Sequence, residues 1–352
     1  MPVESAPMVA RLDNGLVAKQ ARKPADGEML TVAPGVKWLR MPLPFVLNHI
    51  NLWVLEDGDG WCIVDTGIAS KPTQAVWESL LDGELAGRPV TRIIVTHLHP
   101  DHMGLAGWLY ERTGAPVWMT RSEYLSARVL FADQPPAPSE TLAFYRAAGF
   151  TDEQLATYSE GFGVFRKLLS PPPMAFSRMQ ADDQLSIGQH TWRVLIGRGH
   201  SPEHACLYCA ELGLLIAGDQ ALPNISPNVS IWPTEPDANP LHDWLESCRV
   251  LPTQMPADVL VLPAHGRLYT GLGARMAELI AEHEQALDAA RAACAEPRRA
   301  VDLFDALFRG AVNGGNRVMA AGEAMAHLAY LEKAGELQAH TDSSGVRWYQ
   351  RA

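Results

Sequence analysis

The feature of this sequence that most restricts its fold is a group of four side chains of metal-binding type within six residues. His97, His99, Asp101 and His102 follow the apolar run 92–95 directly and precede a run, 103–113, that is typical of a helix. Side chains this close cannot all face one way on a helix or a strand, whereas a loop after a strand can fold them around metal ions. Neutral imidazoles and a carboxylate suit zinc, iron or manganese. The segment therefore predicts a buried strand, a metal-binding loop and a helix.

Three later segments carry residues of the same kind. His200 stands in Gly199-His200-Ser201-Pro202-Glu203-His204, Asp219 in Ala217-Gly218-Asp219, and His265 in Pro263-Ala264-His265-Gly266, each near a predicted strand. The first group resembles the His-x-His-x-Asp-His motif of the metallo-β-lactamase superfamily, and the three later residues follow in the order of that family's ligands. The resemblance covers roughly residues 29–270.

This resemblance implies a site for two divalent transition metal ions per chain. One ion would be bound by His97, His99 and His200, the other by Asp101, His102 and His265, and Asp219 would bridge them. Zinc is the expected metal, with iron and manganese as alternatives. The resemblance further implies that a hydroxide held between the ions attacks the substrate. Asp101 would also orient this hydroxide and pass a proton to the leaving group.

Strand-like and helix-like runs alternate from Met29 to Thr113, which indicates an α/β arrangement. The resemblance makes this the four-layer αββα metallo-β-lactamase fold. We expect a flexible tail at 1–28, a catalytic domain at 29–271 and a small domain at 272–352. The last region reads as an Ala-rich helix, two shorter helices and two strand-like runs, which suggests a winged-helix-like module.

Residues from about 122 to 170 are helical in pattern and rich in aromatic side chains, and the segment ends at Pro171-Pro172-Pro173. We interpret this segment as a helical insert. Its aromatic residues either form a lid over an apolar substrate or fill an ordinary helical core. The sequence leaves both interpretations open.

Several other residues have a functional and a structural interpretation. Asp65 resembles a residue that orients a ligand histidine, with a turn-forming role as the alternative. For His204 a supporting role is favoured over a role as a surrogate ligand. Cys206 and Cys209 lie three apart on a predicted strand and so face opposite sides, which predicts two buried thiols rather than a metal or redox pair.

Two further segments lie close to the site in sequence order. His49 and Asn51, on an early strand, are expected to serve in packing or turns, with a role in the pocket as the alternative. Residues 224–229 follow Asp219 closely, and this position alone suggests that they line the substrate pocket.

Charge and cysteine content limit the ligands and the cellular compartment that we expect for this protein. The chain has 29 basic and 40 acidic residues, a net charge of −11, which argues against binding a nucleic-acid backbone. Five cysteines make no disulfide framework. The polar N-terminal segment lacks the apolar core of a secretory signal, and no apolar run approaches the roughly 18 residues of a membrane span. We therefore expect a cytoplasmic, soluble protein, and a homodimer as the commonest assembly.

The ligand set also discriminates among functions within the family. Flavodiiron-type oxygen reductases carry Glu where this chain has His99, and antibiotic-degrading β-lactamases usually lack the carboxylate at the position of Asp219. We expect a hydrolase acting on a small molecule, a thioester or lactone with an apolar acyl part. An endoribonuclease-like phosphodiesterase and a non-catalytic binding protein are the alternatives. The helix expected at 319–333 would occupy the recognition position of a winged helix, yet it carries Glu323 and Glu332 against Lys333 alone.

Overall fold

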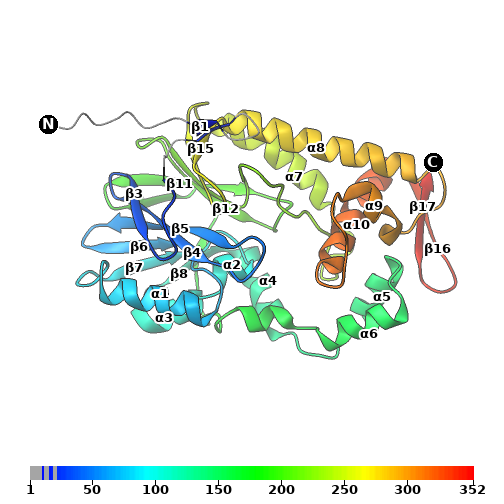
Figure 1. Cartoon of the computed structure of the whole chain (residues 1–352), viewed down its shortest axis with the longest axis horizontal. Coiled ribbons are helices and arrows are strands. Elements are labelled where there is room, and N and C mark those ends of the chain that lie inside the picture. The colour runs from blue at the N-terminus through cyan, green and yellow to red at the C-terminus, as the bar shows by residue number, and fades with distance from the viewer. Residues whose placement is uncertain (1–9, 12–15, 19–21) are drawn as a thin grey trace.

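Two β-sheets packed face to face form the centre of the computed structural model, which describes residues 10–11, 16–18 and 22–352 (Figure 1). The strands are β1 (Ala10–Arg11), β2 (Val17–Ala18), β3 (Met29–Ala33), β4 (Val36–Pro42), β5 (His49–Asp57), β6 (Gly60–Val64), β7 (Val90–Ile94), β8 (Val117–Thr120), β9 (Ser177–Met179), β10 (Gln184–Ile187), β11 (His190–Gly197), β12 (His204–Cys209), β13 (Leu214–Gly218), β14 (Leu260–Pro263), β15 (Tyr269–Thr270), β16 (Leu337–Thr341) and β17 (Arg347–Arg351). The helices are α1 (Lys71–Asp82), α2 (Pro100–Met103), α3 (Ala106–Thr113), α4 (Arg121–Ala132), α5 (Ser139–Ala147), α6 (Asp152–Glu160), α7 (Pro240–Val250), α8 (Leu272–Ala293), α9 (Phe304–Leu307) and α10 (Arg317–Lys333), with 3-10 turns η1 (Val164–Leu168), η2 (Leu251–Gln254) and η3 (Ala300–Leu303).

Apolar side chains divide the described chain into four layers. The sheet β3-β4-β5-β6-β7-β8-β9 packs against the sheet β1-β2-β15-β14-β13-β12-β11-β10, with Trp38, Trp53 and Leu207 in the core between them. A second core lies between the first sheet and helices α1 and α3, and a third covers the outer face of the other sheet with α7 and α8. Figure 1 shows the two helical layers on opposite sides of the paired sheets. The four-layer αββα fold expected from the sequence is confirmed.

Strand direction brings the ligand-bearing loops to one edge of this sandwich. β7 runs parallel to β6, and β13 runs parallel to β14, so that the loops after β13 and β14 begin at the same edge of their sheet. A hydrogen bond from the Ala205 N–H to the Thr96 carbonyl, 2.9 Å long, joins the start of β12 to the loop after β7. The segment 95–102 that follows β7 in one sheet is therefore held against the start of β12 in the other.

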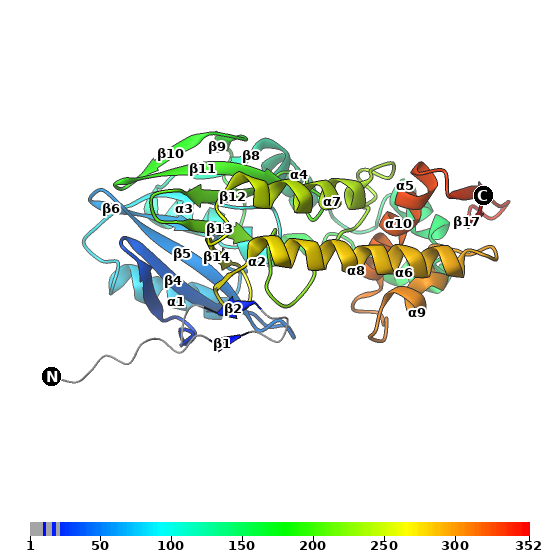
Figure 2. The same ribbon diagram turned by 90° about the horizontal axis from the view of Figure 1, so that it is seen from above.

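The C-terminal region is tied to the rest of the chain by one long helix. α8 begins beside the sheets and runs to the group formed by α9, α10 and the β16–β17 hairpin (Figure 2). The expected order of helices followed by a hairpin is observed. Val17 and Ala18 pair with β15, so these two residues of the expected tail belong to a sheet, whereas most of residues 1–21 lie outside the described chain.

The insert packs its aromatic residues inward. Tyr145 and Phe150 are buried in the same core as α8 and α10, and Tyr124 is buried against the first sheet's helical layer. The Val301 N–H donates to the Ala148 carbonyl, which links the insert to η3 directly. These contacts support the interpretation in which the aromatic residues fill a helical core.

The cysteines and the helices agree with two further expectations. All five cysteines are free and buried. Cys206 lies in the core beneath α7 and α8 and Cys209 in the core between the sheets, as expected for residues on opposite faces of a strand. Within the described residues, no helix is both long and apolar enough to cross a bilayer.

A substitution at Gly107 can test how closely the Ser170–Pro171 segment, at the end of the insert, packs against α3. A Cβ built at Gly107, the second residue of α3, would lie 1.9 Å from the Pro171 carbonyl oxygen, whereas a Cβ at Gly273, the second residue of α8, meets nothing closer than Pro252 at 4.0 Å. Gly107→Ala should therefore lower the free energy of unfolding by roughly 1–3 kcal/mol.

The matched variant Gly273→Ala should be neutral or stabilising by at most about 1 kcal/mol, because it removes a helical glycine without a clash. Chemical denaturation of both variants measures the difference. Equal stabilities would show that the Ser170–Pro171 segment is not held against α3.

Candidate metal centre

All seven predicted ligand residues converge at the edge where the two sheets meet. His97, His99, Asp101 and His102 occupy the loop after β7 and the first turn of α2. The other three come from the opposite sheet. His200 lies in the loop between β11 and β12, Asp219 directly follows β13, and His265 lies in the segment after β14. Their side chains form two groups, within each of which the potential ligand atoms lie within 4.8 Å of one another.

The first group contains His97, His99, His200 and Asp219, and its three histidines are called the three-histidine cluster below. The His97 Nε2 atom lies 2.9 Å from His99 Nδ1 and 3.3 Å from His200 Nε2. The Asp219 Oδ2 atom lies 3.4 Å from His200 Nε2 and 4.0 Å from His97 Nε2. Three imidazole nitrogens and one carboxylate oxygen thus point at a common centre.

The second group, called the Asp101 cluster below, contains Asp101, His102 and His265. The His265 Nε2 atom lies 3.3 Å from Asp101 Oδ2, and His102 Nε2 lies 3.8 Å from the same oxygen. The other oxygen of Asp219, Oδ1, is 3.5 Å from His102 Nε2 and 3.4 Å from His265 Nε2. Asp219 therefore presents one oxygen to each cluster.

These separations fit the donor set of a transition-metal site. Four ligand atoms at 2.0–2.1 Å from a zinc ion lie roughly 3.3 Å apart at tetrahedral angles. His102 Nε2 and Asp219 Oδ1 are buried without a hydrogen bond to any described residue, and buried polar atoms left in this state are unusual unless an ion or water binds them. The residues present therefore fit two metal ions bridged by a carboxylate.

The ring nitrogen that faces away from the clusters is hydrogen-bonded in four of the histidines. In His97 this nitrogen, Nδ1, lies 3.1 Å from the Thr96 hydroxyl. His102 Nδ1 lies 2.8 Å from Asp65 Oδ2, His200 Nδ1 donates to the Asn228 carbonyl, and His265 Nδ1 donates to the His49 carbonyl. Such contacts fix the tautomer and the ring orientation, so that Nε2 is free to bind metal.

Asp65 combines the two roles expected for it. Its φ of 61° lies in the left-handed region, which Asp tolerates better than most residues. Its carboxylate also accepts hydrogen bonds from the Thr96 N–H and hydroxyl, at 2.8 and 2.9 Å. Asp65 therefore shapes the turn after β6 and fixes both the start of the metal-binding loop and His102.

Burial and neighbouring charges set the ionisation of His97, His99 and Asp219. Burial lowers the pKa of His97 well below its usual value and the pKa of His99 to about 3, so both imidazoles are neutral. Burial opposes ionisation of Asp219, but the nearby His102 and His265 outweigh it and hold the pKa of this carboxyl well below its usual range. Neutral imidazoles and an ionised carboxylate are the forms that bind a divalent cation.

His204 lies beside the site without joining either cluster. Its Nε2 atom accepts a hydrogen bond of 3.1 Å from the Asp219 N–H, and burial lowers the pKa of the ring so that it stays neutral. Gly218 makes this contact possible, since a Cβ there would lie 2.5 Å from His204 Nε2. The expected supporting role of His204 is what the structure shows.

The early strand β5 also supports the site without supplying ligands. Asn51 donates from Nδ2 to the carbonyls of Pro263 and Gly266, on either side of His265. His49 accepts at Nε2 from the Gly266 N–H. These contacts agree with the expected packing and turn roles and show that both residues shape the His265 segment.

Glu123 is a supporting residue that the sequence does not reveal. This buried side chain of α4 accepts hydrogen bonds from the Leu98 N–H, the Ser201 hydroxyl and the Glu203 N–H, at 2.9, 2.6 and 2.7 Å. It joins the loop after β7 to the loop that carries His200. Its only sequence signal is an acidic residue in the first turn of a helix, which is common and nonspecific.

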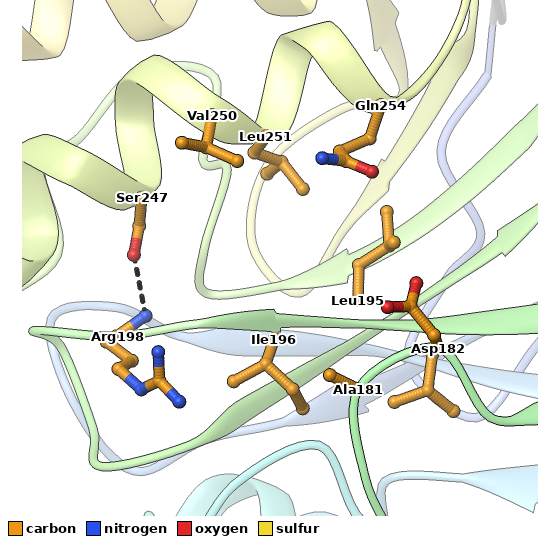
Figure 3. A pocket seen from close by; sticks show the side chains of 10 residues that line it. Ala181, Asp182, Leu195, Ile196, Arg198, Ser247, Val250, Leu251 and Gln254 are labelled. Atoms are coloured by element: carbon orange, nitrogen blue, oxygen red, sulfur yellow. Dashed lines mark hydrogen bonds between the residues drawn. The ribbon is translucent and has the colours of Figure 1, made fainter.

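A cavity of about 200 Å³ lies away from these ligands, between β11 and the segment formed by α7 and η2 (Figure 3). Its lining includes Arg198 and Ser247 and none of the seven ligand residues. The Arg198 N–H donates to the Ser247 hydroxyl across 2.9 Å, which fixes the start of the His200 loop to α7.

Known proteins resemble both parts of the chain. A sequence profile described as the metallo-beta-lactamase superfamily matches residues 46–265, and one described as metallo-beta-lactamase-like, C-terminal domain, matches residues 287–352, beginning inside α8. "Probable metallo-hydrolase YqjP" of Bacillus subtilis is 23% identical over 88% of this chain and 95% of the relative.

Two solved structures resemble the whole molecule. A beta-lactamase domain protein from Burkholderia ambifaria is 42% identical with a TM-score of 0.87, over 94% of this chain and 96% of that protein. A metallo-beta-lactamase family protein from Thermus thermophilus is 29% identical with a TM-score of 0.76, over 92% of this chain and all of that protein. By its sequence and its fold, this chain belongs to the metallo-beta-lactamase superfamily.

Proposed function

We propose that this protein is a dinuclear metal-dependent hydrolase acting on a thioester or a lactone with an apolar acyl part. The observation that carries the proposal is the position of Asp219, whose two oxygens face the three-histidine cluster and the Asp101 cluster respectively. A carboxylate in this place can bridge two metal ions. The Bacillus subtilis relative is described as a probable metallo-hydrolase, which agrees with the proposed reaction class.

The chain's own side chains would bind the two metal ions, and the ions would activate the substrate and the attacking water. Two divalent ions supply a polarised carbonyl and a water of lowered pKa, and zinc suits the histidine-rich donor set. His97, His99 and His200 would hold one ion, Asp101, His102 and His265 the other, and Asp219 would contribute to both. Asp101, whose side chain is one-fifth exposed, would also orient the attacking water and pass a proton to the leaving group.

Exposed apolar side chains near the site support an acyl substrate. Phe45 is about half exposed and Val46 is fully exposed. Both lie on the turn that precedes His49, whose backbone carbonyl accepts a hydrogen bond from His265. Ile225 is exposed on the segment that follows Asp219. Apolar groups left in water beside a polar centre favour a ligand that is apolar in one part and hydrolysable in another.

The position of α10 argues against the endoribonuclease alternative. A recognition helix must present an exposed face to a groove. In α10 residues 320–322 and 324–328 are buried, so the middle of this helix is covered on every side. Glu332 near its end forms an ion pair with Arg347 of β17. We propose that α10 serves the protein's own core.

A substrate panel together with metal analysis tests the proposed function. Wild-type protein should bind about two zinc ions per chain and hydrolyse acyl thioesters or acyl lactones, in a panel that also contains single-stranded RNA. Asp101→Ala should lower kcat/KM for that substrate by at least about 100-fold, since it removes a ligand and the proton-holding group together. Steady-state kinetics and elemental analysis of both proteins give the answer.

The control is Asp288→Ala, which removes an exposed carboxylate on α8 that pairs with Arg291. It should leave metal content and kcat/KM unchanged. Cleavage of RNA alone would transfer the proposal to the phosphodiesterase alternative. Wild-type protein that retains less than about one metal per chain after reconstitution would support the non-catalytic binding protein instead.

Asp65→Asn isolates the charge that orients His102. Asn tolerates the left-handed backbone of this position, so the turn should survive. Its amide nitrogen, however, would face the Nδ1–H of His102 and favour the tautomer whose proton sits on Nε2, the metal-binding atom. Zinc affinity of the Asp101 cluster should fall by roughly 10- to 100-fold, measured by competition with a chromophoric chelator.

The comparison variant is Asp57→Asn, which alters a carboxylate that binds Thr91 and Arg92 at the far end of the same strands. Its zinc affinity should match that of the wild type. If Asp65→Asn binds both zinc ions as tightly as the wild type does, the orienting role of Asp65 is wrong.

A further inference from the structure

We propose that Glu323, on α10 of the C-terminal region, is a positioning residue for the metal centre. It holds Asn228, whose backbone carbonyl orients the ligand His200. This inference rests on the proposed metal centre and assigns to the C-terminal region a part in building it. Three contacts in series carry the argument.

The first contact joins the ligand to the loop. His200 Nδ1 donates to the Asn228 carbonyl oxygen over 2.8 Å, which leaves Nε2 facing His97 and Asp219. Because the acceptor is a backbone atom, no side chain at residue 228 can replace it or remove it. What matters is where the segment around Asn228 lies.

The second contact joins the loop to α10. The Asn228 Nδ2 group donates to Glu323 Oε2 over 2.7 Å, and the Ser230 hydroxyl bridges the Asn228 side-chain oxygen and the Met319 carbonyl. The Ile231 N–H donates to the Gly322 carbonyl over 3.1 Å. The loop therefore packs along one turn of α10.

Gly322 shows how close this approach is. A Cβ at that position would lie 2.7 Å from the Ser230 Cβ and 3.0 Å from the Ile231 carbonyl oxygen. The loop and the helix are therefore in backbone-to-backbone contact, and a shift of α10 moves the Asn228 carbonyl with it.

The third contact holds α10 in place. His327 Nδ1 donates to the Glu323 carbonyl over 2.8 Å, so the neutral ring presents Nε2 as an acceptor, and His283 Nδ1 of α8 lies 3.4 Å from it. Burial lowers the pKa of His283 to about 3 and lowers that of His327 as well, which keeps both rings neutral. The turn of α10 that bears Glu323 is thereby tied to α8.

The ionisation state of Glu323 determines which substitutions at this position keep the acceptor for Asn228 and which remove it. Burial raises the pKa of this carboxyl to about 7, and no basic side chain is among the causes that oppose the shift. A neutral acid accepts from Asn228 through its carbonyl oxygen, and a glutamine side chain offers the same oxygen at the same length. Leucine fills the space and offers no acceptor.

The test measures zinc affinity in protein that also carries Asp101→Ala, in which the three-histidine cluster alone keeps all its ligands. Competition with a chromophoric chelator gives a single dissociation constant for this cluster. Glu323→Leu should weaken zinc binding by about 10-fold, whereas Glu323→Gln should bind as the parent does. Glu332→Leu, on the same helix but paired with Arg347, is the matched control and should also bind as the parent does.

Asn228→Ala provides a second route to the same contact. It keeps the backbone carbonyl and removes the amide that binds Glu323, so it should weaken zinc binding as Glu323→Leu does, even if the latter folds poorly. Rescue by glutamine separates a positioning role from a general loss of stability, which thermal unfolding records for every variant.

Parent-like zinc affinity in both Glu323→Leu and Asn228→Ala would overturn the inference and leave the proposed function intact. Equal weakening by Glu323→Gln and Glu323→Leu would overturn it as well, because the acceptor oxygen would then be irrelevant. Failure of the wild-type protein to bind zinc would instead refute the metal centre itself.

Discussion

The structure depends on keeping two carboxylates, Asp101 and Asp219, close together in a largely buried site. Buried charges are costly unless opposite charges or strong hydrogen bonds accompany them. Here the imidazoles of His102 and His265 lower the pKa of both carboxyls in the metal-free chain, although burial acts in the opposite direction. Burial opposes ionisation of His102 and His265, but nearby carboxylates raise the pKa of both rings: Asp65, Asp219 and Asp101 act on His102, and Asp219 and Asp101 act on His265. Divalent cations would replace those protons as the compensating charge.

This arrangement requires several loops to be held rigidly, and the chain does so with hydrogen bonds across large distances in sequence. Glu123 joins the loop after β7 to the loop bearing His200. Asp65 fixes the start of the first of these loops, and Asn51 brackets His265 from another strand. Glu123 and Asn51 lie on regular elements, which place ligands more reproducibly than loops alone would.

The grouping of the seven candidate ligand residues could be predicted from the sequence because side chains of these types rarely occur so close together. His97 to His102 fall within six residues after an apolar strand, and the family order supplied His200, Asp219 and His265; the structure brings all seven together. The sequence did not reveal Glu123, Asn228 or Glu323 as supporting residues, because each acts on a partner that is distant in sequence. Asn228 and Glu323, for example, are 95 residues apart. The insert's aromatic residues were ambiguous for a related reason, since apolar periodicity does not show which surface a helix contacts.

The sequence pattern places a domain boundary at residue 272, but one hydrophobic core contains residues from both sides of this boundary. α8 contributes Leu279 and Leu287 to the same core as the outer sheet and α10, and the insert's Tyr145 belongs to that core too. Separate domains need few contacts across a linker. Here α8 belongs to both parts, and α10 contacts the loop that carries the acceptor for His200. A region joined to the sheets in this way would transmit its own position to His200, so that under our proposal changes in it would alter the metal centre without touching substrate.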